Sequence, residues 1–123
     1  MKKENKQTYK ERLEILFLTH LPDECPKPTP EYEFMHSRKW ALDYAIASLK
    51  IGIEYDGIVF KPNQQRGGHQ TPKGMANDME KRNEAQIRGW LVLVCTQKTI
   101  DDRTFIDQLE RAIKVRKGDI RYE

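Results

Sequence analysis

Two carboxylates lie two residues apart at the end of an apolar run in the middle of the chain. The run reads Leu-Lys-Ile-Gly-Ile-Glu-Tyr-Asp-Gly over residues 49–57 and contains Glu54 and Asp56. In a β-strand both acids would point to one face of the sheet, together with Gly52, while the two isoleucines and Tyr55 would point to the other. Like charges at one edge repel each other unless a cation neutralises them, so neutralising one acid would stabilise the protein. The spacing therefore predicts a divalent metal or a Lys/Arg partner at this edge.

A third acid, Asp43, lies in the preceding apolar run, Ala-Leu-Asp-Tyr-Ala-Ile-Ala, at residues 41–47. If the two runs form a hairpin with a tight turn at Ser48, Asp43 lies beside Glu54. Small residues on the same faces leave space for a metal with its water ligands, and hard oxygen ligands favour Mg²⁺ or Mn²⁺ over zinc. The alternative is that the acids are solvated on an open sheet face.

Two further residues could assist chemistry at these acids. His69 follows an Arg-Gly-Gly run in a polar loop over residues 61–73. It is either solvated or positioned to activate a water or to steady a phosphate. Lys81 lies three residues after Asp78 on a predicted helix. It either forms a surface salt bridge or projects back to the carboxylates, where a cation would stabilise developing negative charge.

The length and composition predict one domain over residues 1–123. The net charge is +3 and 33% of the residues are charged, which permits a nucleic-acid partner although no basic tail is present. Cys25 and Cys95 are too far apart for a zinc pattern or a disulfide framework, so we expect reduced thiols in a cytoplasmic protein. No stretch approaches the roughly 20 apolar residues that cross a bilayer, and no membrane partner is expected.

The apolar spacing predicts the order helix, three strands, helix, strand, helix. The proline-rich segment 21–30 should be an exposed loop, and Thr99 should be the N-cap of the last helix, with Asp102 at its third position. The predicted helices cover residues 7–20 and 75–88 and a stretch after Thr99, and the predicted strands cover residues 32–35, 41–47, 49–56 and 90–96.

Several short segments between residues 31 and 96 form a recognisable series. They are Arg38-Lys39-Trp40 with Asp43-Tyr44-Ala45, Ile53-Glu54-Tyr55-Asp56-Gly57, Gly67-Gly68-His69, Asp78-x-x-Lys81-x-Asn83-x-Ala85 and Gly89-Trp90-x-Val92-Leu93. In order and spacing this series resembles the PD-(D/E)XK nuclease superfamily, in particular small phage and bacterial endonuclease-like proteins related to very-short-patch repair and EDxHD homing endonucleases. The resemblance implies an α/β fold with a restriction-endonuclease-like αβββαβ core, in which helices flank a mixed sheet.

The resemblance also implies roles for individual residues. Asp43 would be the first metal-binding aspartate and Glu54 the second acid, with the carbonyl of Tyr55 as a further ligand. The superfamily's general pattern has a lysine two residues after the second acid, whereas this chain has Asp56, as the similar branch does. Asp56 would then support the metal or a second ion. The missing positive charge would come from His69 or Lys81. Apart from the resemblance, Glu14 and Glu11 of the first helix are either the polar residues that an amphipathic helix needs or acids that point over the sheet edge and complete the metal shell.

The activity that the resemblance implies is Mg²⁺- or Mn²⁺-dependent endonucleolytic hydrolysis of DNA phosphodiester bonds, in a bacterial cell or a phage-infected host. Two alternatives stay open, a structure-selective junction-resolving or recombination nuclease and a catalytically inactive nucleic-acid-binding module. Such folds often form homodimers for double-strand cleavage, but the sequence shows no clear dimer surface. The basic residues expected to bind backbone phosphates are Arg38, Lys39, Lys61, Arg66, Lys73 and Arg82.

Overall fold

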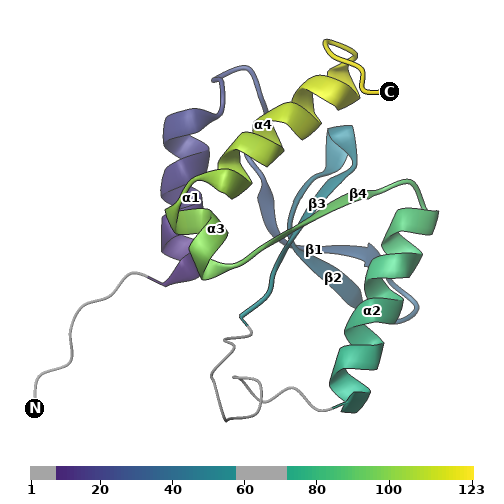
Figure 1. The fold of residues 1–123 in the computed structure, drawn as a ribbon. Coiled ribbons are helices and arrows are strands. Elements are labelled where there is room, and N and C mark those ends of the chain that lie inside the picture. Colours follow the sequence, from purple (N-terminus) through teal and green to yellow (C-terminus); the bar gives the residue numbers. More distant parts are fainter. Residues whose placement is uncertain (1–7, 58–71) are drawn as a thin grey trace, which may run out of the picture.

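The computed structural model describes residues 8–57 and 72–123 of the chain (Figure 1). The predictions at Lys61, Arg66 and His69 lie outside the described residues. The order helix, three strands, helix, strand agrees with the prediction, and two helices follow in place of the single one expected. The elements are α1 (Tyr9–His20), β1 (Thr29–Met35), β2 (Trp40–Ile46), the 3₁₀ turn η1 (Ala47–Leu49), β3 (Ile51–Tyr55), α2 (Pro72–Ile87), β4 (Leu91–Cys95), α3 (Gln97–Asp101) and α4 (Thr104–Lys117).

The strands form one mixed sheet in the order β1-β2-β3-β4. The first three strands are antiparallel neighbours, whereas β4 pairs with β3 in parallel. A parallel pair needs a crossover connection, and here the segment that contains α2 provides it. Helices α1, α3 and α4 lie on one side of the sheet and α2 lies on the other (Figure 1). The chain is therefore an α/β protein with a four-stranded sheet flanked by helices.

The core consists of two clusters separated by the sheet. The larger cluster packs α1, α3 and α4 against the sheet and contains Ile51 and Ile53, whereas a smaller cluster under α2 contains Leu42 and Trp90. Gly52 faces the smaller cluster, because a Cβ there would meet Leu42. The predicted alternation of the two faces of β3 is therefore confirmed. Within the described ranges, no helix is long and apolar enough to cross a membrane.

The segment before β1 differs from the prediction of an exposed loop. Leu21 and Cys25 are buried in the larger cluster, and Pro28 is buried as well. Strand β1 then begins at Thr29, three residues earlier than predicted. The prolines end helix α1, but the apolar side chains between them still pack against the core, and that burial holds the segment on the sheet.

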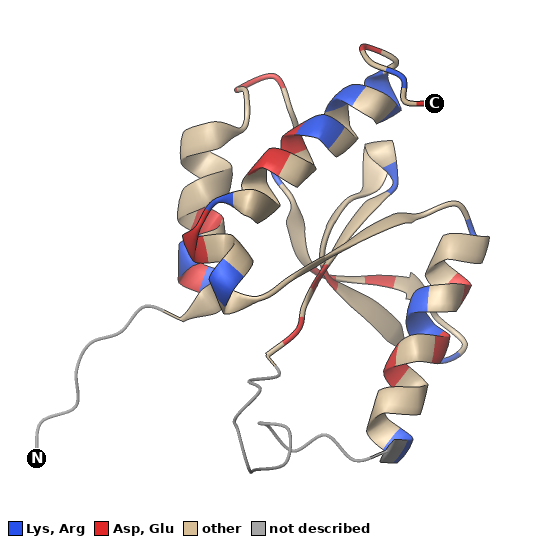
Figure 2. Cartoon of the chain, viewed as in Figure 1, with Lys and Arg blue, Asp and Glu red and all other residues tan. Residues whose placement is uncertain are grey.

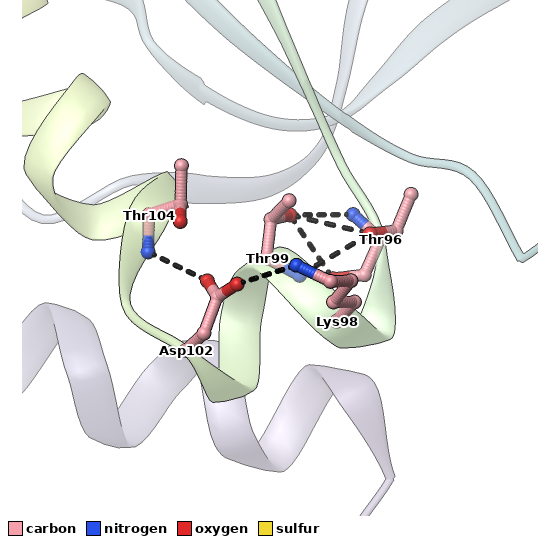
Figure 3. Close-up of polar contacts among 5 residues, drawn as sticks. All are labelled: Thr96, Lys98, Thr99, Asp102 and Thr104. Atoms are coloured by element: carbon pink, nitrogen blue, oxygen red, sulfur yellow. Dashed lines mark hydrogen bonds and ion pairs between the residues drawn. The ribbon is translucent and has the colours of Figure 1, made fainter.

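The last helical region is divided in two, and the prediction that Thr99 is its N-cap was wrong. Thr96 is the N-cap of α3, and the Thr99 hydroxyl accepts a hydrogen bond from the Thr96 N–H at 2.9 Å (Figure 3). Arg103 then adopts a left-handed conformation, with φ of 67°. Asp102 accepts from the N–H of Thr104 at 2.9 Å, and hydrogen bonding to Thr104 lowers the pKa of Asp102 to about 2. These local bonds stop α3 and start α4.

The contact between Gly52 and Leu42 gives a stability prediction. A Cβ at position 52 would lie 2.6 Å from Leu42 Cδ1, and Leu42 is fully buried. Gly52→Ala should lower the free energy of unfolding by about 1–3 kcal/mol, because the packed side chain cannot move without strain. Urea denaturation checks this value. The double variant Gly52→Ala/Leu42→Val should recover part of the loss, and equal losses in the single and double variants would contradict the overlap.

Candidate active site

Asp43 and Glu54 lie together where strands β2 and β3 diverge. The N–H of Asp43 donates to Glu54 Oε2 at 2.9 Å, and the N–H of Tyr55 donates to Asp43 Oδ2 at 2.7 Å. The regular antiparallel register of β2 and β3 extends as far as the pair Tyr44 and Ile53. Each acid thus accepts a backbone hydrogen bond from the opposite strand just beyond that pair. The hairpin prediction that places Asp43 beside Glu54 is confirmed.

Glu54 is the one buried polar or charged residue among those that the structure describes, with 6% of its surface exposed. Its partner is Lys81 of α2, whose Nζ lies 2.6 Å from Glu54 Oε1 and also donates to the carbonyl of Ala41 at 3.0 Å. Burial raises the pKa of Glu54, and the nearby ammonium group acts in the opposite direction. Lys81 therefore projects back to the carboxylates and does not form a surface salt bridge.

This ion pair changes an expectation drawn from the acids alone. Repulsion between uncompensated carboxylates would make neutralisation of Glu54 stabilising. In the structure, however, its two oxygens accept from two different donors, Asp43 N–H and Lys81. Glutamine has a single acceptor oxygen, so its amide N–H₂ would face one of those donors. Glu54→Gln is consequently expected to destabilise the protein.

The two acids line a pocket of about 500 Å³. It lies at the carboxyl ends of the parallel strands β3 and β4, where open α/β sheets commonly bind ligands. Tyr55, Asp56 and Thr96 come from those strand ends, and the other wall comes from α2. The α2 residues that line the pocket are Met75, Asp78, Met79, Lys81 and Arg82.

Arg82 brings a second positive charge to the pocket wall. Its Nε is buried and has no hydrogen-bond partner among the residues that the structure describes. A buried donor without a partner costs free energy, and a ligand with acceptor oxygens would offset that cost. Guanidinium groups suit phosphate oxygens in particular. This position fits the sequence prediction that Arg82 binds phosphate.

The oxygen atoms in the pocket provide part of the ligand set that a hard divalent cation needs. Asp43 and Glu54 offer carboxylate oxygens, and Tyr55 and Asp56 line the same pocket. Within residues 8–57 and 72–123 no group of three or more His, Cys, Asp or Glu side chains is arranged to hold a metal. Asp56 thus does not form a ready-made cluster with the other two acids. Mg²⁺ tolerates such a site, because it usually keeps several water ligands and binds through one or two carboxylates.

The acids of α1 lie away from this pocket lining. Glu14 Oε2 accepts a hydrogen bond from the hydroxyl of Tyr44 at 2.9 Å. Burial raises the pKa of Tyr44, and Glu14 adds to the effect. Glu11 belongs to the capping box of α1, where it accepts from the N–H of Thr8 at 2.9 Å. Neither acid is among the residues that line the pocket.

Other predicted phosphate-binding residues surround α2 and the β1–β2 turn. Arg38 lies over the Trp40 ring, 4.0 Å from its centroid, and pairs with Glu80 of α2 at 3.5 Å. Lys39 in the same turn and Lys73 in the first turn of α2 are exposed. Figure 2 shows acidic and basic segments alternating along α2. The turn and the helix thus carry cations on the α2 side of the sheet.

No family model, curated protein or solved structure matches this chain. The functional assignment therefore depends on the geometry of the pocket. Three of its lining residues, Met75, Met79 and Thr96, were not identified from the sequence. The i, i+4, i+7 spacing of Met75, Met79 and Arg82 was the available signal, since it places them on one helix face.

The pair of Lys81 and Glu54 predicts a pH-dependent loss of stability. Lys81→Met keeps the aliphatic stem but removes the cation, so the folded-state pKa of Glu54 should rise further above its ordinary value of 4.5. A raised folded-state pKa favours folding below that ordinary value, and the benefit is lost as the pH rises through the folded-state pKa. The variant should therefore lose little stability near pH 4, where only the hydrogen bond to the carbonyl of Ala41 is missing, and about 3 kcal/mol at pH 7.

Denaturant unfolding at a series of pH values measures this difference. Lys98→Met is the matched control, because Lys98 forms an exposed pair with Asp102, and exposed pairs contribute little to stability. A loss in Lys81→Met that is the same at pH 4 and pH 7 would show that the ammonium does not compensate the buried carboxylate.

Proposed function

We propose that this chain is a Mg²⁺- or Mn²⁺-dependent endonuclease that hydrolyses phosphodiester bonds in DNA. The observation that carries the proposal is the arrangement of Asp43, Glu54 and Lys81 in one pocket, with the ammonium 2.6 Å from the buried carboxylate. Two hard anionic ligands beside a fixed cation suit a reaction in which negative charge develops on a phosphoryl group.

In this proposal Asp43 and Glu54 hold the cation, and the carbonyl of Tyr55 is a further ligand. The hydrogen bonds between the strands fix both carboxylates before substrate binds. Asp56 supports the ion from the end of β3. When bound, the metal supplies Lewis acidity toward the phosphoryl oxygens and lowers the pKa of a coordinated water.

Lys81 supplies the positive charge that the general superfamily pattern places two residues after the second acid. The position of Lys81 supports this role. Its ammonium group reaches the carboxylate of Glu54 from α2, although Lys81 and Glu54 are 27 positions apart in the chain. There it orients Glu54 and stabilises charge on the scissile phosphate. His69 remains the candidate for transferring a proton from the attacking water.

The arrangement of the sheet is consistent with a restriction-endonuclease-like core. Helix α1 precedes three antiparallel strands, and α2 leads to a fourth strand parallel to the third. In this proposal the DNA lies along the α2 side of the pocket, because the cations gather there. Arg82 inside the pocket, with Lys73 and the β1–β2 turn at its margin, would bind the phosphates.

A second candidate is a DNA-binding module without catalysis. The observation in its favour is that both oxygens of Glu54 already accept protein hydrogen bonds or ion pairs. If Lys81 replaced the metal at this carboxylate instead of working beside it, the pocket would bind phosphate without cleaving it. Metal-dependent cleavage distinguishes the two candidates.

Loss of the first metal ligand should abolish cleavage while leaving the fold unchanged. Asp43→Asn keeps an oxygen that can accept from the N–H of Tyr55, so the hairpin should remain intact. We expect nicking of supercoiled plasmid in Mg²⁺ to fall by at least about a hundredfold, whereas DNA binding in Ca²⁺ should largely survive. Cleavage should also be absent in EDTA.

The matched control is Asp119→Asn, which neutralises an exposed acid near the end of the chain. Cleavage by Asp43→Asn at a rate near wild type would reject this site. Absence of metal-dependent cleavage by wild type on supercoiled, linear, single-stranded and four-way-junction DNA would favour the binding module. Selective cleavage of the junction would identify a structure-selective nuclease.

Single-turnover cleavage can separate the roles of Lys81 and His69. Lys81→Met should reduce the rate by about a hundredfold with little change in affinity, because the lost charge acts mainly in the transition state. Lys81→Arg should restore part of the rate. His69→Ala should reduce the rate less than Lys81→Met does. The rates are measured under conditions in which circular dichroism shows that each variant is folded.

A reversed order of the two effects would assign the principal role to the histidine. In that case the wild-type rate should rise with pH through about 6.5, the reference histidine value, and His69→Ala should abolish the rise. Rates near wild type in both variants would remove both residues from the mechanism.

A further inference from the structure

Strand β4 lies at an edge of the sheet and has β3 as its only neighbouring strand in the described part of the chain. The N–H of Leu91 donates to the carbonyl of Lys50 at 2.9 Å, and the carbonyl of Cys95 accepts from the N–H of Asp56 at 2.8 Å. Backbone groups alternate in direction along a strand. The N–H and C=O groups of Val92 and Val94 therefore point outward, away from β3.

This edge lacks the features that usually prevent strands from pairing. Proteins protect a free edge with charged residues, proline or bulges. The sequence of β4, Leu-Val-Leu-Val-Cys, contains none of these residues and is wholly apolar. Its pairing with β3 is in continuous register from Ile51↔Leu91 to Tyr55↔Cys95. The strand is thus a regular template for one more strand.

A groove of about 480 Å³ runs between this edge and α4. Its apolar lining includes Val94, Val115 and Tyr122, which are 37%, 36% and 59% exposed. Gln108 and Arg111 of α4 contribute polar groups to the same groove. An exposed apolar patch beside polar groups is typical of a protein interface.

The charges of α4 indicate which partner fits. Its first half carries Asp107 and Glu110, and its last turns carry Lys114, Arg116 and Lys117, so the helix changes from acidic to basic along its length (Figure 2). A second copy in antiparallel orientation would place the acidic half of each α4 toward the basic half of the other. The like-charged Arg111 residues near the centre are each paired with Asp107 in their own chain, at 3.0 Å.

We propose that two copies of this chain pair through the free edges of β4, antiparallel and about a twofold axis at Leu93. In that register Val92 of one copy faces Val94 of the partner subunit. The outward N–H and C=O groups of both residues then form hydrogen-bonded pairs on each side of the axis. The two sheets become one continuous sheet, and the contact is isologous, as a closed dimer requires. This inference does not depend on the proposed nuclease function.

Light scattering coupled to size exclusion tests the dimer. Wild type should elute with twice the 14.5 kDa chain mass. Val94→Lys places a cation at the paired edge and should give a monomer with unchanged circular dichroism. Val94→Thr keeps β-branching and size, so it should remain a dimer. A monomeric wild type at all micromolar concentrations, or a dimer unaffected by Val94→Lys, would overturn the proposal.

A cysteine cross-link tests the register independently. At the axis, Leu93 faces Leu93 of the partner subunit in a non-hydrogen-bonded pair, where Cα atoms lie about 4.5 Å apart. That separation allows a disulfide, so Leu93→Cys should form a covalent dimer under mild oxidation. Val94→Cys should not, because its like residue lies beyond disulfide reach. The native thiols, Cys25 and Cys95, are buried in the chain. Equal cross-linking of both variants would reject the twofold at Leu93.

Discussion

Each oxygen of a buried carboxylate needs a hydrogen-bond donor or a cation, and the buried Glu54 imposes that constraint on this protein. Its two oxygens connect three elements, since one accepts from the backbone of β2 and the other contacts the ammonium from α2. Removing one partner of such a pair leaves a charge in a poorly solvated place, which is costly. The carboxylate of Glu54 therefore fixes the position of α2 relative to the sheet, and it also contributes negative charge to the pocket.

The topology explains why the remaining pocket residues meet there. Strands β3 and β4 are parallel, so their carboxyl ends lie at the same edge and bring Tyr55, Asp56 and Thr96 together. The crossover between β3 and β4 includes α2, which lies over the face of the sheet that carries Glu54. Its methionines, Lys81 and Arg82 form the opposite wall. The single βαβ connection thus supplies Glu54, Asp56 and the cationic wall of the site, and Asp43 comes from the neighbouring strand β2.

Much of the site could be predicted from the sequence. The alternation of side chains along β3 predicted that its isoleucines lie in the core, and the predicted hairpin placed Asp43 beside Glu54. The direction of Lys81 was left open, because helical spacing puts a residue on a face but does not say what that face covers. The division between α3 and α4 was missed, since it depends on side-chain bonds of Asp102 and a left-handed Arg103. Similarly, the bond from Tyr44 to Glu14 arises only when α1 packs on the sheet.

The most direct test of a metal site at Asp43 and Glu54 is the binding of Mn²⁺, followed by electron paramagnetic resonance. Titration of Mn²⁺ into wild type and Asp43→Asn reports occupancy without requiring turnover, and Mg²⁺ serves as the competitor. If the two carboxylates hold the ion, wild type should bind Mn²⁺ competitively with Mg²⁺, and Asp43→Asn should bind it at least about tenfold more weakly, a change of about 1.4 kcal/mol. Equal Mn²⁺ affinity in the two proteins, or no binding by wild type even with DNA present, would contradict the account.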